Sequence, residues 1–340
     1  MDAAVAEGGV IPQDDLQAVE TLRAAYHEIK AELAKMIVGQ DEVIEQLLIA
    51  IFARGHCLLE GVPGLAKTLL ISSLSQALEL SFKRIQFTPD LMPSDITGTE
   101  IIQDDPETRE RKYKFLPGPI FANVILADEI NRTPPKTQAA LLEAMQERQV
   151  TIGGDIYQLQ QPFFVLATQN PLEQEGTYPL PEAQQDRFLF KILVDYPSDA
   201  EETEIMKSVT VSRDVTISPI LNGEQIIAFQ EVVKRVPVAD HIYDFARKIV
   251  RATRAGRDDA LDVANDWTVW GAGPRASINL ISAARARAVL KGEVHVSTED
   301  IAAIAKPVMR HRIGLNFSAQ AEGLTADNLV EMILEKVPSK

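Results

Sequence analysis

The sequence predicts an α/β protein with a mainly parallel sheet, followed by a second, all-helical domain. Short apolar runs that suit strands buried on both faces alternate with amphipathic segments up to residue 196. A glycine-bearing loop over 61–68 joins one such run to a helical segment, and after 196 only amphipathic segments follow. We therefore expect a disordered N-terminus over 1–12, a core over 13–196 and a helical domain over 197–340.

Composition limits the classes of protein that this chain can be. Its 340 residues carry a formal net charge of −15, which opposes non-specific attraction to nucleic acids and anionic membranes. No apolar run approaches the roughly 20 residues that cross a bilayer, and the N-terminus has no secretory signal. We expect a cytoplasmic protein without membrane insertion. The single cysteine, Cys57, falls in a predicted buried strand and is expected to act as a small apolar residue.

Two helices and a turn are expected ahead of the glycine-bearing loop. Apolar residues recur at helical spacing from Leu16 to Met36, behind acidic residues that favour a helix start. Residues 37–40 break this pattern, and a second helix is expected from Asp41 to about Ala53. A strand over 56–60 then leads into the loop.

Beyond the loop, strands and helices are expected to alternate. Residues 88–95 read as a loop with two prolines, and 96–120 as an insertion of mixed polarity whose basic stretch, 109–114, is a solvated loop face. A β-hairpin over 149–159 turns at two glycines. Trp267 and Trp270 precede a glycine turn and suit packing better than nucleic-acid stacking. The remaining strands are expected at 82–87, 123–129, 163–167 and 188–194, and the helices from 134 through 145 and near 199–210, 222–235, 238–255, 274–291 and 298–312.

The loop over 61–68 has the features of a phosphate-binding P-loop. A loop that enters a helix presents free backbone N–H groups, and the helix start adds a positive partial charge. Lys67 supplies a mobile cation for the outer phosphates, and the Thr68 hydroxyl can hold Mg²⁺. Ala66 stands where the general pattern has a second glycine, and its methyl group is tolerable if its φ is helical. A glycine and proline turn followed by Lys-Thr is the alternative. The predicted nucleotide-binding residues of this loop are Gly61, Val62, Pro63, Gly64, Leu65, Ala66, Lys67, Thr68 and Leu69.

Two acidic residues end the predicted strand over 123–129. In a parallel sheet, ligands gather at the carboxyl ends of the strands. Asp128 is placed to hold Mg²⁺ directly or through water, and Glu129 to orient and deprotonate an attacking water. Acidic residues also close strands that serve no site, so the prediction depends on their pairing with the P-loop.

Three more polar residues are candidates for the same chemistry. Asn170 follows the next buried strand, where a neutral amide could hold water beside a γ-phosphate, although asparagine there is usually a turn former. Arg187 could neutralise charge on a transferring phosphoryl group if it came from outside the site, or it could simply pair with Asp186 or a surface partner. Arg275 lies in the first turn of a predicted helix, where a cation is unfavourable unless an anion such as a bound phosphate faces it.

Several contiguous motifs together resemble the MoxR family of AAA+ ATPases. The resemblance runs from about residue 33 to 330, and such long motifs are far more specific than the P-loop alone. It is carried by residues 61–68, 127–132, 134–138, 141–145, 167–171, 176–184, 186–188 and 274–276.

The resemblance implies a fold and a set of site residues. The fold would be a P-loop AAA+ core with a helix-2 insertion at 96–120 and a pre-sensor-1 hairpin at 148–160, followed by an all-α lid. Asn170 would take the sensor 1 position, Arg187 the arginine finger and Arg275 sensor 2. Val38 and Gly39 fall in the region that lines the adenine. The family often carries alanine at the position of Ala66, whereas Gln185 and Gly273 replace its more usual Leu and Ser at positions that do not contact phosphate.

The resemblance also implies a function. Family members form rings, usually hexamers, that use ATP and Mg²⁺ to remodel a protein client, often beside a protein with a von Willebrand factor A domain, in complex maturation or metal insertion. Three alternatives stay open. A nucleic-acid motor is opposed by the charge of −15. A small-molecule phosphotransferase would use Arg187 and Arg275 within one monomer. A nucleotide-gated scaffold without turnover would not need the intact Lys67, Asp128 and Glu129.

Overall fold

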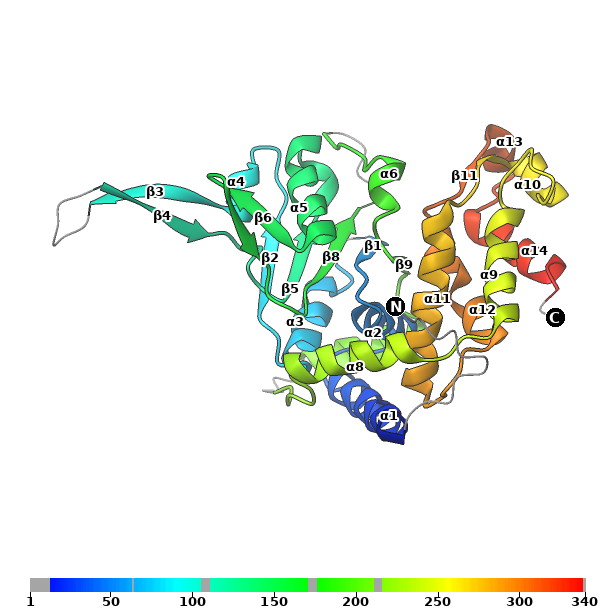
Figure 1. Ribbon diagram of the computed structural model, residues 1–340, viewed down its shortest axis with the longest axis horizontal. Helices are drawn as coiled ribbons and strands as arrows, with labels where there is room; N and C mark the ends of the chain where they lie inside the picture. The colour runs from blue at the N-terminus through cyan, green and yellow to red at the C-terminus, as the bar shows by residue number, and fades with distance from the viewer. Residues whose placement is uncertain (1–12, 63, 105–110, 171–175, 211–215, 339–340) are drawn as a thin grey trace, which may run out of the picture.

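The structure is a computed structural model that describes residues 13–62, 64–104, 111–170, 176–210 and 216–338. Figure 1 shows a sheet with helices on both faces, a long β-hairpin projecting at one end and a group of helices at the other. The predicted disordered segment 1–12 and Pro63 of the P-loop lie outside the described residues. None of the helices in the described ranges has the length and apolar character to cross a membrane.

The central sheet has five parallel strands in the order β2-β5-β8-β1-β9. Because all of them run the same way, their carboxyl ends meet at one edge, as the sequence predicted. Cys57 is fully buried in β1, as expected. The strands are β1 (Cys57–Gly61), β2 (Phe82–Gln86), β5 (Val124–Asp128), β8 (Phe164–Gln169) and β9 (Phe190–Val194).

Alternate residues of the apolar strands face two separate cores. In β5, Leu126 packs on the side of helices α1, α2 and α3, while Ile125 packs on the side of α5. This double burial explains why the strands are apolar throughout instead of alternating with polar residues. The helices of the two faces are α1 (Gln13–Leu33), α2 (Asp41–Phe52) and α3 (Lys67–Ala77), and α5 (Pro135–Glu147).

Two β-hairpins extend from this core. The residues of the insertion form β3 (Gly98–Asp104) and β4 (Arg111–Pro117), so the expected loop face at Arg111 and Lys114 is in fact an exposed strand. Gly98 has φ +96°, and a Cβ there would lie 2.2 Å from the carbonyl of Leu116 in the partner strand, so the hairpin base needs glycine. The expected loop over 88–95 also ends early, because helix α4 (Pro93–Thr97) begins at Pro93. The predicted hairpin over 149–159 is confirmed, and its strands are β6 (Gln149–Ile152) and β7 (Asp155–Gln158).

The C-terminal region is helical, with one exception. The prediction that strands cease after residue 196 is wrong at β10 (Thr268–Trp270) and β11 (Gly314–Leu315), which pair antiparallel. The Trp270 ring covers Gly314, where a Cβ would lie 2.4 Å from the ring, so this tryptophan does pack as expected. The helices here are α7 (Asp199–Thr210), α8 (Gly223–Arg235), α9 (Asp240–Ala252), α10 (Asp262–Trp267), α11 (Pro274–Lys291), α12 (Thr298–Met309), α13 (Phe317–Ala321) and α14 (Ala326–Lys336), of which α10, α13 and α14 were not predicted.

One apolar cluster joins the sheet to these helices. It includes Leu59 of β1 and Phe229 of α8, and continues to Leu280 of α11 and Ile333 of α14. Helix α8 contacts α1 and α2 as well as α11, and lies next to α1 beneath the sheet in Figure 1. The division into a core over 13–196 and a lid over 197–340 therefore stays a prediction.

Candidate active site

An open cavity of about 410 Å³ lies at the carboxyl edge of the sheet, beside the start of α3. The register explains which side chains meet there, because Gln86 of β2 is level with Asp128 of β5, and Ala127 is level with Ala167 of β8. The residues that follow each strand therefore converge on the P-loop. The cavity is lined by Gly64, Leu65, Ala66, Lys67, Thr68, Arg84, Asp128, Glu129, Thr168, Gln169 and Asn170.

Eight of the predicted site residues line this cavity, seven others among the described residues do not, and Pro63 lies outside the described residues. Gly61 is the last residue of β1, where a Cβ would lie 2.6 Å from the carbonyl of Val194, so its small size also serves strand packing. The turn before α2 reaches the loop through Gln40, whose Nε2 donates to the Leu65 carbonyl at 3.3 Å. The predicted residues that do not line the cavity among the described residues are Val38, Gly39, Gly61, Val62, Leu69, Arg187 and Arg275.

The P-loop enters α3 through a left-handed residue. Ala66 is the N-cap of α3, with φ 52° and ψ 25°, so the condition under which its methyl group would be tolerated without strain, an ordinary helical φ, is not met. An L-residue in this region costs about 1–2 kcal/mol, and such strain is concentrated at ligand-binding turns. The Ala66 side chain cannot cap the helix, which leaves the first N–H groups of α3 directed at the cavity edge.

Lys67 stands at the centre of the loop. Its Nζ donates to the carbonyl of Gly61, which folds the side chain back over the loop. Burial lowers the pKa of Lys67, and the negative charges of Asp128, Glu129 and Glu60 oppose that shift. A phosphate chain in the cavity would favour the ammonium form further.

Both oxygens of Asp128 have partners in the protein. Oδ1 accepts a hydrogen bond from the Thr168 hydroxyl at 2.7 Å, and Oδ2 accepts from Arg84 Nε at 3.0 Å and Nη2 at 2.6 Å. The Asp128 carboxylate and the Thr68 hydroxyl line the same cavity, and such hard oxygen donors suit Mg²⁺. The residues present therefore fit this ion, although a cation at Oδ2 would have to displace the Arg84 guanidinium.

The Glu129 carboxylate is also held in place. Its Oε2 accepts a hydrogen bond from Gln86 Nε2 at 2.8 Å and forms an ion pair with Arg132 Nε at 3.0 Å. Its backbone is left-handed, with φ 57°, and its N–H donates to the Thr168 hydroxyl at 2.9 Å. Thr168 thus connects the two acidic residues, while the buried Asn170 lies two positions further along the chain.

Sequence reasoning missed four of these partners: Arg84, Gln86, Arg132 and Thr168. Arg84 and Gln86 are exposed alternate residues of β2, and their side chains meet Asp128 and Glu129 only because β2 is the neighbour of β5. Nothing in the local sequence gives the strand order. Thr168 lies inside the motif over 167–171. Its place directly after the predicted buried strand over 163–167 was the available signal.

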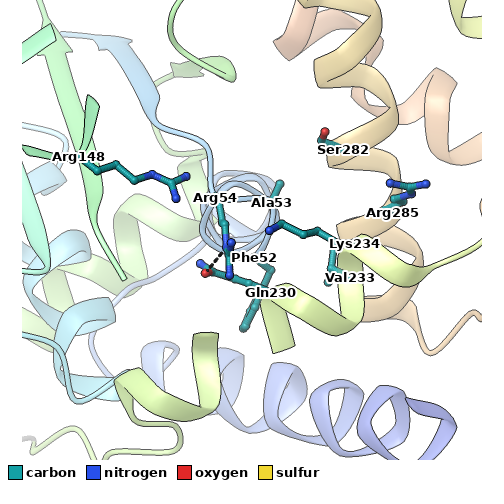
Figure 2. Close-up of a pocket in the computed structure, with 9 residues that line it drawn as sticks. All are labelled: Phe52, Ala53, Arg54, Arg148, Gln230, Val233, Lys234, Ser282 and Arg285. Carbon is teal, nitrogen blue, oxygen red and sulfur yellow. Dashed lines mark hydrogen bonds between the residues drawn. The ribbon is translucent and has the colours of Figure 1, made fainter. Parts of the chain in front are cut away.

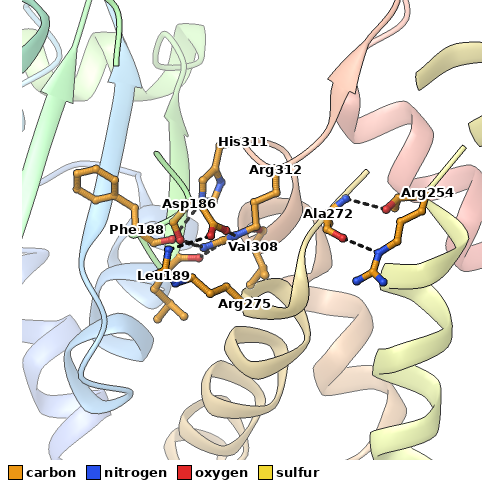
Figure 3. Close-up of polar contacts among 10 residues, drawn as sticks. Asp186, Phe188, Leu189, Arg254, Ala272, Arg275, Val308, His311 and Arg312 are labelled. Carbon is orange, nitrogen blue, oxygen red and sulfur yellow. Dashed lines mark hydrogen bonds and ion pairs between the residues drawn. The ribbon is translucent and has the colours of Figure 1, made fainter. Parts of the chain in front are cut away.

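Arg187 and Arg275 have partners outside the cavity. Arg187 Nη1 donates to the Leu142 carbonyl at 3.0 Å, so the alternative that it pairs with Asp186 is wrong. Asp186 instead accepts from Arg275 Nη1 at 3.1 Å and from Arg312 Nε at 2.8 Å, as Figure 3 shows. An anion therefore faces Arg275 in the structure, and it is the Asp186 carboxylate. A role of Arg275 toward a phosphate stays a prediction.

The parallel sheet, the P-loop and the acidic pair at its edge define a P-loop ATPase, and family comparisons agree. A family model described as ATPase family associated with various cellular activities (AAA) matches residues 56–190, and an AAA lid domain model matches 263–333. A solved structure from Cytophaga hutchinsonii is 43% identical, has a TM-score of 0.87, and the match covers 95% of this chain and 97% of that one. The chain is therefore an AAA-type enzyme that hydrolyses ATP.

Relatives along nearly the whole chain define the family more narrowly. Chaperone MoxR1 of Mycobacterium tuberculosis is 43% identical over 319 residues, which are 94% of this chain and 82% of the relative. Protein MoxR of Methylorubrum extorquens is 32% identical over an alignment of 345 positions, gaps included, which covers 93% of this chain and 96% of the relative. YeaC of Bacillus subtilis is 44% identical over 304 residues, or 89% and 91%. This chain belongs to the MoxR family of AAA ATPases.

Proposed function

We propose that the chain hydrolyses ATP with Mg²⁺ as a homo-oligomeric ring, a hexamer as in the resembling family, and uses the energy to remodel a protein client. One observation carries this proposal. The P-loop, Asp128 and Glu129 share one cavity, whereas Arg187 does not line it and points to the carbonyl of Leu142 in another part of the molecule. A hydrolytic site that needs this arginine is then completed by a second copy of the chain.

The roles of the residues follow from their places at the cavity. The first N–H groups of α3 and the Lys67 ammonium would bind the phosphates, and Thr68 and Asp128 would hold the Mg²⁺. When bound, Mg²⁺ neutralises the charge that develops on the β- and γ-oxygens. Glu129, fixed by Gln86 and Arg132, accepts a proton from the attacking water, which Asn170 orients. Val38 and Gly39 line the adenine.

The two arginines complete the site from elsewhere. Arg187 of a neighbouring copy neutralises charge on the transferring phosphoryl group, which is worth about 10³–10⁵ in rate for comparable arginines. Arg275 reads the presence of nucleotide, and its partner in the structure is Asp186. Movement of Arg275 from Asp186 to a phosphate would change how α11 sits on the core.

The client is a protein rather than a nucleic acid. The acidic charge of −15 opposes binding to a polyanion, and the relative from Mycobacterium tuberculosis is named a chaperone. We further infer, from the family resemblance, a cytoplasmic partner with a von Willebrand factor A domain and a role in complex maturation or metal insertion.

The test separates binding from hydrolysis in the Glu129→Gln variant. We expect it to bind ATP with unchanged affinity by calorimetry, because the amide keeps the shape of the carboxylate, and to release phosphate about 10²–10⁴ times more slowly. The same variant should retain its client in a pull-down only when ATP is present. Phosphate release at the wild-type rate would remove Glu129 as the base.

A further inference from the structure

A second, strongly basic hollow lies near the amino ends of β1 and β9, away from the P-loop. Its two adjoining cavities have volumes of about 270 and 280 Å³ and share Arg54, Arg148 and Ser282. The 270 Å³ cavity is also lined by Arg187, and the 280 Å³ cavity by Lys234 and Arg285. Figure 2 shows Arg148 extending toward Arg54 from the opposite wall.

The charges in this hollow are not balanced by the chain itself. No carboxylate lines the 270 Å³ cavity among the described residues, although three arginines do. Glu231 pairs with Arg54 at 2.5 Å and with Lys234 at 3.2 Å, and Glu143 and Glu147 line a separate adjoining cavity with Arg187. The cations of the hollow still outnumber these acids. In a protein with a net charge of −15, such a cluster of cations indicates a site for an anion.

Arg148 lines both cavities of the hollow, and none of the described residues neutralises its charge. Within the part of the chain that the structure describes, its guanidinium makes no hydrogen bond and no ion pair. Burial lowers the pKa of Arg148, and the positive charge of Arg54 lowers it further. Both arginines end a helix in left-handed backbone, Arg148 with φ 55° at the end of α5 and Arg54 with φ 56° just after α2, so the two helix ends direct them to the same hollow.

We propose that Arg54 and Arg148 join Arg187 to bind the outer phosphates of an ATP that the P-loop of a second copy holds. This inference rests on the proposed function, which already brings Arg187 to that nucleotide. Arg187 lines the same cavity as Arg54 and Arg148, so the three positive charges share one space into which a phosphate chain could enter. Planar guanidinium groups bind phosphate oxygens in pairs, and a triphosphate carries more charge than one arginine neutralises.

Mixing two inactive variants tests whether Arg148 acts on a neighbour. Arg148→Gln keeps its own P-loop, and Lys67→Ala keeps its own Arg148, so each alone should lose at least about tenfold in ATP hydrolysis. In a 1:1 mixed assembly, about one quarter of the interfaces pair an intact Lys67 with an intact Arg148. We expect activity to reappear there. No recovery on mixing would overturn the proposal.

One further mixture shows which claim fails. Arg187→Ala mixed with Lys67→Ala tests the shared site itself. Recovery there without recovery for Arg148→Gln overturns only the new assignment, whereas no recovery in either mixture overturns the proposed function as well. The matched control is Arg247→Gln, an exposed α9 arginine paired with Asp244, which should leave hydrolysis unchanged.

A free polyphosphate would present the same phosphate oxygens to this hollow as a bound ATP. Sodium tripolyphosphate is therefore added to the Lys67→Ala chain, whose P-loop is impaired, and its binding is measured by calorimetry. The proposal is contradicted if two results occur together: tripolyphosphate binds Lys67→Ala but not the Lys67→Ala/Arg148→Gln double variant, and mixing restores no hydrolysis. The hollow would then be a site for free polyphosphate.

Folding of the test variant is checked by thermal unfolding. We expect the Tm of Arg148→Gln to equal or exceed that of the wild type, because the substitution removes a cation that has no partner and repels Arg54. If the Tm falls, Arg148→Met, which keeps the apolar stem of the side chain, replaces it in the mixing experiment with the same expected recovery.

Discussion

Thr168 is the residue that joins the two acidic groups of the candidate active site. Its hydroxyl donates to Asp128 Oδ1 and accepts the N–H of Glu129, and its side chain is 2% exposed. Both hydrogen bonds are made away from bulk water, so each group would be left unsatisfied if the hydroxyl were removed. The position of the acidic pair therefore depends on a neutral residue of the next strand.

We expect Thr168→Val to lower the free energy of unfolding by about 1–3 kcal/mol, because it keeps the shape of the side chain and removes the hydroxyl. ATP hydrolysis should fall as well, since Glu129 loses the bond that fixes its left-handed backbone. Urea unfolding and phosphate release measure the two effects. Thr168→Ser, which keeps the hydroxyl, is the control, and a Val variant as stable and active as the wild type would contradict this role.

At the scale of elements, the start of α3 is strained where the sequence departs from the general P-loop pattern. We expect Ala66→Gly to raise the free energy of unfolding by about 0.5–1 kcal/mol, because relief of the left-handed conformation outweighs the greater freedom of glycine in the unfolded chain. Ala77→Gly, at the buried end of the same helix, should instead destabilise the protein. Destabilisation by Ala66→Gly would show that φ at residue 66 is not left-handed.

The elements that could be predicted from the sequence are those with a single consistent pattern. The inner strands β1, β5 and β8 were predictable because both of their faces are buried, and the P-loop with its acidic pair because each motif consists of adjacent residues. The hairpin β3–β4 was not, since Ile102 and Tyr113 are exposed on it at 59% and 74% and no polar alternation marks its strands. Arg84 and Gln86 enter the site through the order of the strands, which no local pattern encodes.

At the scale of the whole molecule, Asp186 ties the core to the C-terminal helices. Its carboxylate neutralises Arg312, whose side chain is 1% exposed and which also donates to the backbone carbonyl of Phe188 at 2.5 Å (Figure 3). Burial lowers the pKa of Arg312, and Asp186 opposes that shift. Asp186, the neighbour of the proposed arginine finger Arg187, thus anchors the end of α12 to the sheet.

We expect Asp186→Asn to lower the free energy of unfolding by about 3–5 kcal/mol, because it leaves a buried cation without its counter-charge. Arg275→Gln is the control, since it removes only the half-exposed partner of Asp186 and should cost less than about 1 kcal/mol. Equal losses for the two variants in urea unfolding would show that the buried pair does not hold the regions together.

The central claim is that hydrolysis needs two copies of the chain. It is tested most directly by the rate of ATP hydrolysis per chain, measured against protein concentration alongside the size of the assembly by light scattering. We predict a rate that rises steeply as the assembly forms and then levels off, and that stays low at every concentration in Arg187→Ala. A constant rate per chain in a protein that remains monomeric would contradict the account.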